Sequence, residues 1–179
     1  TSLTEAGRRA RTAPRARRYP LAMFSVALAS VLAPLAVSSS EPGDWPQWRG
    51  AEGDGLSHGV AWAPEGNTKW TAEIGLGYSA ASVSGGRVVA FGFDAERSLD
   101  VLRALELETG KELWKQEWPG ELRANQHEGG TLSTPAIAGE LVYTSTSSGT
   151  LLCHRLSDGT LVWKHDLAAE HELDPGYYG

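Results

Sequence analysis

A glycine stands four residues before a tryptophan at three places in this sequence. The three pairs are Gly66 with Trp70, Gly110 with Trp114, and Gly159 with Trp163. Successive tryptophans of these pairs are 44 and 49 residues apart. A repeat of about 40 to 50 residues that is built from strands is typical of the blades of a β-propeller. The spacing therefore favours a repeat architecture before any single residue is considered.

The middle copy, residues 104–114, is the clearest unit and reads ALELETGKELW. Its centre is a turn signal, because Gly110 adopts a positive φ at no steric cost and Thr109 hydrogen-bonds locally. An apolar run of strand length precedes the turn, and a strand of mixed polar and apolar residues follows it. The unit therefore predicts two strands joined by a tight turn, with Trp114 on the second strand.

A second alignment supports the same architecture. Residues 79–89 align without a gap with residues 133–143, 54 positions further along. We predict strands at 78–83, 87–93, 99–107 and 111–118 in one blade, and at 134–137, 141–145, 150–156 and 160–166 in the next. The predicted fold class is all-β, an incomplete propeller of four-stranded antiparallel blades with between two and three blades present.

The blade count leads to an expectation about the length of the protein. Propellers need about four to eight blades to close. We therefore expect the chain to be the N-terminal part of a longer protein, with propeller repeats over residues 60–179. The segment around Trp70 is expected to be the outer strand of an incomplete or ring-closing blade.

The segment 104–114 resembles the tryptophan-docking motif of the PQQ-type β-propeller repeat. That repeat occurs in quinoprotein dehydrogenases and in non-catalytic relatives such as the outer-membrane assembly factor BamB. In that family the tryptophan stacks between blades and an alanine packs beneath it. The resemblance assigns structural docking roles to Ala104, Thr109, Gly110 and Trp114, to Gly159 and Trp163, and to Gly66 and Trp70.

The three copies differ in how closely they follow the motif. Glu106 stands where the family favours Asp or Asn, and Cys153 stands where it has Ala. The copy around Trp70 keeps only its glycine and its tryptophan. The resemblance covers roughly residues 44–179 and is specific for the repeat rather than for an activity. We interpret Cys153, the only cysteine, as a buried small hydrophobe rather than a reactive thiol.

Residues 1–38 have the pattern of an export signal. Six arginines and one glutamate lie within residues 1–20, and the uncharged apolar run 21–37 and the small residue Ser38 follow. We predict a secretory signal peptide cut after Ser38; the alternative is a membrane anchor formed by residues 21–37. Arg17-Arg18 leaves a twin-arginine signal open, although the residues after it fit that pattern poorly. Either reading places the rest of the chain outside the cytoplasm, periplasmic or secreted.

The net charge of the chain after residue 38 limits the classes of partner that it can bind. Without residues 1–38 the chain has ten basic and 21 acidic residues, a net charge of −11 over 141 residues. An acidic domain repels nucleic acid and anionic lipid, so no nucleic-acid partner is expected, and membrane contact only through an uncleaved leader. The expected partners are proteins or a small ligand at the propeller face.

Residues 39–59, called the linker segment below, are rich in Ser, Gly and Pro and contain Trp45 and Trp48. We expect both tryptophans to pack against the propeller rather than to form a strand. An aromatic platform for sugar binding is the alternative.

Two groups of polar residues are candidates for a site. His127, in the loop 126–130 before the second blade, is the candidate ligand contact, because such loops face the central channel; a capping or turn role is the alternative. His165 and His171, with acidic residues around them, match no compact zinc pattern, so a solvated acidic loop is expected rather than a metal site. No catalytic residue is identified.

Two functions follow from the resemblance. The first is an exported, non-catalytic propeller that acts as a binding scaffold. The second is the N-terminal part of a PQQ-dependent alcohol or sugar dehydrogenase, which by resemblance needs PQQ, calcium, an acidic base and often adjacent cysteines. No cofactor is evident in this sequence, and PQQ with calcium would require ligands from residues beyond it.

Overall fold

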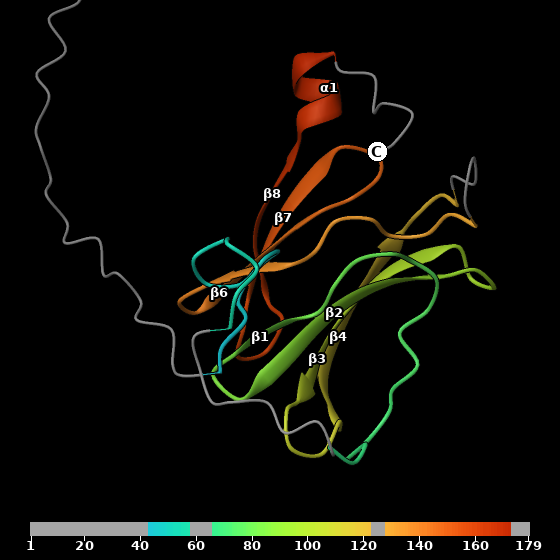
Figure 1. The fold of residues 1–179 in the computed structure, drawn as a ribbon. Coiled ribbons are helices and arrows are strands. Elements are labelled where there is room, and N and C mark those ends of the chain that lie inside the picture. The colour runs from blue at the N-terminus through green and yellow to red at the C-terminus, as the bar shows by residue number, and fades with distance from the viewer. Residues whose placement is uncertain (1–42, 58–65, 123–127, 173–179) are drawn as a thin grey trace, which may run out of the picture. The chain divides into compact units, whose positions relative to one another are not determined.

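The computed structural model describes residues 43–57, 66–122 and 128–172. These residues form two four-stranded antiparallel sheets, each with its strands in sequence order (Figure 1). The first sheet contains β1 (Ser82–Ser84), β2 (Arg87–Asp94), β3 (Leu99–Glu106) and β4 (Glu112–Pro119). The second contains β5 (Ala136–Ala138), β6 (Leu141–Ser145), β7 (Thr150–Arg155) and β8 (Leu161–Asp166), and a short helix, α1 (Leu167–His171), follows it. The prediction of an all-β chain with four-stranded antiparallel blades is confirmed.

The first strand of each sheet is shorter than predicted. β1 and β5 have three residues each, and the residues before them run beside each other instead of extending the sheets. Gly77 pairs in parallel with Thr131, and the Ala80 N–H donates to Thr134 Oγ1 at 3.1 Å. Backbone groups of the residues before β1 and β5 therefore bond between the two repeats. A longer first strand would have used these groups to pair with the next strand of its own sheet.

The segment around Trp70 also differs from the prediction. Within the described residues the structure assigns no strand to 66–75. A strand needs a neighbouring strand for its backbone groups, and this segment instead attaches to the first sheet through side chains. Lys69 pairs with Glu108 at 3.0 Å, and Arg103 Nη1 donates to the Ile74 carbonyl at 3.1 Å.

The core lies between the two sheets. β2 is buried from Val88 to Phe93, because both of its faces are covered. One cluster of buried side chains draws on both sheets: Val89, Phe91, Leu102, Ala104, Trp114, Ile137, Val142 and Leu156. Cys153 is buried and free, as expected for a small hydrophobe.

Trp114 connects the two sheets through its indole. Its Nε1–H donates to the Leu156 carbonyl at 2.9 Å, and its ring lies over Gly159. A Cβ at Gly159 would meet the ring at 2.6 Å, and the φ of +74° also favours glycine. The turn of the second sheet is therefore shaped to receive this indole.

Trp70 makes the same contact one repeat earlier. Its Nε1–H donates to the Leu107 carbonyl at 2.9 Å, and a Cβ at Gly110 would meet its ring at 2.5 Å. Gly110 has a φ of +72°. The glycine turn of each sheet therefore accepts the tryptophan that precedes it by one repeat.

We expect Trp114→Ala to destabilise the protein by about 3 to 5 kcal/mol, because it removes a large side chain that is only 8% exposed. Trp48→Ala is the control, because Trp48 is 66% exposed and its loss should change stability by less than about 0.5 kcal/mol. Chemical denaturation of both variants measures the difference. Equal unfolding midpoints for the two variants would contradict the role given to Trp114.

Candidate functional site

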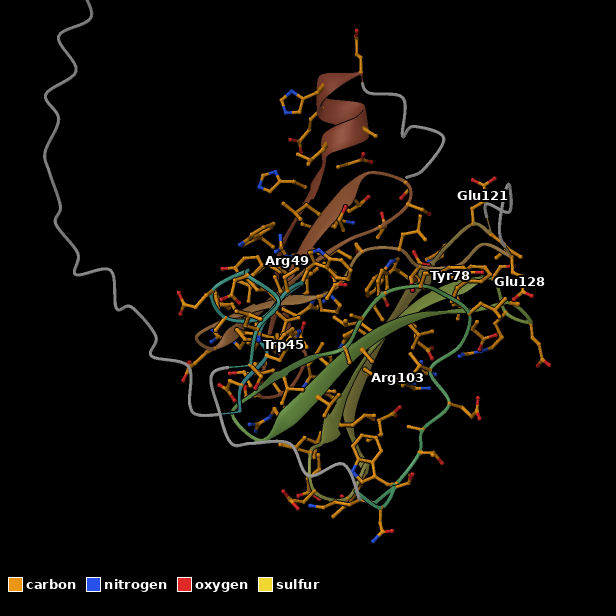
Figure 2. All side chains as sticks on the ribbon, viewed as in Figure 1. Trp45, Arg49, Tyr78, Arg103, Glu121 and Glu128 are labelled. Carbon is orange, nitrogen blue, oxygen red and sulfur yellow. The ribbon has the colours of Figure 1, made fainter. Side chains whose placement is uncertain are left out.

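The predicted ligand contact, His127, lies outside the described residues. Glu128, which is described, follows it, and Figure 2 shows its side chain together with those of Tyr78 and Glu121. Tyr78 is exposed, and its backbone N–H donates to the Thr131 carbonyl at 2.8 Å. The ligand role of the 126–130 loop therefore stays a prediction.

The hydroxyl groups on β1 and in the segments before β1 and β5 form hydrogen bonds within the fold. Ser79 and Thr131 both donate to the Phe91 carbonyl, at 2.6 and 2.8 Å. Ser82 donates to the Pro135 carbonyl, and Ser84 donates to Asp44 Oδ2 at 2.8 Å. The bonds from Ser82 and Thr131 join the two repeats, whereas Ser79 bonds within the first repeat and Ser84 bonds to the linker segment. All four hydroxyl groups are therefore engaged within the fold.

A cleft of about 320 Å³ separates the outer parts of the two sheets. Its walls are the end of β4, the turn between β6 and β7, and the facing sides of β7 and β8. Its lining includes Gln116, Trp118, Thr146, Thr150, His154 and Lys164. The lining mixes hydroxyl, amide, aromatic and cationic groups, which suits a small polar ligand or ordered water.

His154 and Trp118 are two of the residues that line this cleft. Their rings stack with centroids 5.9 Å apart and planes 12° from parallel, and Trp118 also packs on Phe91. His154 is only 2% exposed, and its Nδ1 has no hydrogen-bond partner among the described residues. Burial lowers the pKa of His154, so the imidazole is neutral near pH 7.

Asp100 lies beside Trp118, on the neighbouring strand β3. It is the cross-strand partner of Trp118 and is 4% exposed. Burial raises the pKa of Asp100 to about 6, and the nearby Trp118 indole opposes this rise. The Trp118 Nε1 itself does not reach hydrogen-bond geometry with any described group. A buried carboxyl group with a pKa of about 6 therefore lies next to Trp118.

The rim of the cleft carries a charge network. Arg97 contacts Glu117 at 2.9 Å and Asp94 at 2.8 Å, and Lys115 contacts Glu117 at 2.9 Å. These partners, Arg97 first, lower the pKa of Glu117 to about 2. Glu117 therefore stays ionised and paired, which makes it a poor general base.

The histidines after β7 do not gather into a metal site in the described part of the chain. His165 Nδ1 lies 3.2 Å from Glu170 Oε1, and Asp166 caps α1 by accepting from the Ala169 N–H at 3.0 Å. The segment expected to be a solvated acidic loop therefore includes a short helix that uses Asp166 as its cap. No group of three or more His, Cys, Asp or Glu suited to a metal occurs among the residues described.

Asp100, Trp118 and His154 were not singled out from the sequence. They come from β3, β4 and β7, and no short motif connects them. Counting residues across the hairpin of β3 and β4 would have placed Asp100 opposite Trp118. His154 offers no such signal, because its contact depends on how the two sheets pack.

We expect the buried carboxyl of Asp100 to make stability fall as the pH rises. Its pKa is raised in the folded state, so its contribution is complete below about pH 4 and is lost as the pH passes about 6. Relative to Asp100→Asn, the wild-type protein should lose up to about 3 kcal/mol of unfolding free energy between pH 4 and pH 7. Urea unfolding of both proteins across this range measures the difference, and parallel pH profiles would contradict the assignment.

The family was identified by comparison with known proteins. The model of the family described as outer membrane protein assembly factor BamB matches residues 54–176. A comparison with curated proteins gives no significant match.

Solved structures give only partial similarity. The europium-containing methanol dehydrogenase is 20% identical with a TM-score of 0.37, over 48% of this chain and 14% of its own. BamB from Moraxella catarrhalis is 24% identical with a TM-score of 0.30, over 46% of this chain and 25% of its own. The computationally designed Ika8 protein is 17% identical with a TM-score of 0.27, over 52% of this chain and 36% of its own. The chain thus spans well under half of each of these structures. Because the family match covers more than half of the sequence, the chain belongs to the family described as outer membrane protein assembly factor BamB, a family of PQQ-type propeller repeats.

Proposed function

We propose that this chain is part of an exported propeller that acts as a non-catalytic binding scaffold for proteins or a small ligand. The observation that carries the proposal is that the hydroxyl groups on and near β1 and β5 are engaged in hydrogen bonds within the fold. Ser79, Ser82, Ser84 and Thr131 all hydrogen-bond within the fold. Two of these bonds, from Ser82 and Thr131, join the two repeats, and the four hydroxyl groups do not form an acid–base pair.

The titratable groups of the cleft support the same proposal. His154 is neutral and stacked, and Glu117 is ionised and held by two cations. General acid–base catalysis needs a group with a suitable pKa within reach of a substrate proton. Asp100 has a pKa near 6, but its side chain is buried. These residues favour binding over proton transfer.

The dehydrogenase alternative requires a different set of residues. Calcium takes six to eight oxygen ligands, mostly from carboxylates and carbonyls. The described residues contain no cluster of three such side chains, so they do not fit a PQQ–calcium site on their own. A site of that kind would need groups from other parts of a longer protein.

Retention of PQQ separates the two functions. A longer protein that contains this chain is purified, mixed with PQQ and Ca²⁺, dialysed, and examined by absorbance and by dye reduction with alcohols and sugars. We expect no stoichiometric PQQ to remain and no dye reduction, because a binding scaffold has no PQQ–calcium site. Stoichiometric retention with alcohol- or sugar-dependent reduction would favour the dehydrogenase.

Export is the second part of the proposal, and it rests on the leader sequence. Arginines precede the apolar run 21–37, which is the order of a signal peptide. Among the described residues, no helix is long and apolar enough to cross a membrane. The localisation we propose is extracytoplasmic, with anchoring through residues 21–37 if the leader is not cut.

Leu28→Arg tests the leader, because a charge in the centre of the apolar run opposes insertion. Expressed in a bacterium, the unmodified chain should appear in the periplasmic fraction or the medium, beginning at residue 39. The variant should stay in the cytoplasm at full length. Immunoblotting of cell fractions and N-terminal sequencing measure both outcomes, and equal distribution of the two proteins would exclude export through this segment.

A further inference from the structure

We propose that the inner edges of β1 and β5, the edges that do not pair with β2 and β6, form a binding site for an extended peptide, and that the linker segment fills this site within the same chain. Residues 44–46 of the linker segment make the contacts. They lie before residue 54, where the family match begins, so this contact is an addition to the repeat. The proposal does not depend on the scaffold function.

The first contact is a complete antiparallel pair. The Trp45 N–H donates to the Val83 carbonyl, and the Val83 N–H donates to the Trp45 carbonyl, both at 2.8 Å. Val83 is the middle residue of β1, which pairs with β2 along its other edge. Figure 2 labels Trp45, and Figure 1 shows residues 43–57 beside β1. Trp45 therefore adds a short strand to the inner edge of the first sheet.

The second contact repeats the first on the neighbouring sheet. The Ile137 N–H donates to the Pro46 carbonyl at 2.7 Å. Ile137 is the middle residue of β5 and occupies the position in its repeat that Val83 occupies in the first. Consecutive residues of the linker segment therefore satisfy equivalent positions of the two sheets.

The side chains of the linker segment match this role. Proline has no backbone N–H, so Pro46 presents only the carbonyl that Ile137 needs. Asp44 Oδ2 accepts from the Ser84 hydroxyl at 2.8 Å, beside the pair formed by Trp45. The Trp45 ring lies on Gly50, where a Cβ would meet it at 3.0 Å. The site thus recognises an extended Asp-Trp-Pro sequence followed by a glycine turn.

Without this segment the inner edges would expose unpaired backbone groups. The Val83 N–H and carbonyl and the Ile137 N–H would lose their partners, and an open strand edge readily accepts another strand. The first strands of propeller blades line the central channel. The linker segment therefore covers backbone on the channel side, and any competing ligand there would be an extended peptide.

The experiment removes the segment and supplies it separately. Residues 43–53 of the full chain are replaced by a Gly-Ser sequence, and a fluorescent peptide of residues 43–57 is titrated while anisotropy is followed. We expect saturable binding to the replaced chain and at least about tenfold weaker binding to the intact chain, whose site is filled. Equal binding to both proteins, or no binding to a folded replaced chain, would overturn the proposal.

Two peptide variants test the contacts. Trp45→Pro removes the N–H that pairs with Val83, so its binding should fall at least about tenfold. Trp48→Ala is the control and should bind like the unmodified peptide, because Trp48 is exposed. Equal affinity of the Trp45→Pro peptide would contradict the strand pairing.

A measurement on the intact chain remains decisive if the replaced chain does not fold. Trp45→Pro is introduced into the full chain, and amide hydrogen exchange is measured at Val83, Ile137 and Val89. Exchange at Val83 and Ile137 should accelerate at least about tenfold, with Val89 in β2 unchanged as the control. Unchanged protection at Val83 and Ile137 would overturn the proposal.

Discussion

The contact between a tryptophan indole and the glycine turn of the next repeat is the interaction on which the rest of the structure depends. A four-stranded sheet has two faces, and it is stable only when its apolar face is covered. Trp114 helps to cover the apolar faces of both sheets. It belongs to the first sheet, and its indole donates to the Leu156 carbonyl of the second. The glycine at position 159 permits the close approach. The core of the described chain is therefore shared between blades.

The inner ends of the sheets are fixed by a different kind of contact. Hydroxyl and backbone groups link the segments before β1 and β5, and the linker segment pairs with both inner edges. The Trp114 contact combines buried apolar surface with one hydrogen bond, whereas the contacts at the inner ends are hydrogen bonds of hydroxyl and backbone groups. Together they fix the spacing of the two sheets. The cleft between their outer parts, where Trp118 stacks on His154, is the space that this spacing leaves.

Much of the fold could be predicted from the sequence because its main signals are local. The turn at Gly110 and the β6 range, 141–145, depend on neighbouring residues, and the structure has both where the pattern indicates them. Contacts between distant segments left no such signal. The short β1 depends on pairing between sheets, Trp45 pairs with Val83 despite its proline and glycine neighbours, and His154 meets Trp118 only after the sheets pack. The candidate site was therefore largely hidden from sequence reasoning.

A double-mutant cycle between Trp114→Ala and Gly159→Ala tests the central contact most directly. Gly159→Ala introduces both a strained positive φ and a clash with the indole, whereas Gly139→Ala, at a φ of +58° with open space around it, introduces the strain alone. If the indole and the glycine turn form one unit, Gly159→Ala will cost at least about 1 kcal/mol less in the Trp114→Ala background, and Gly139→Ala will cost the same in both. An equal cost of Gly159→Ala with and without the indole would show that the two sheets are held together in some other way.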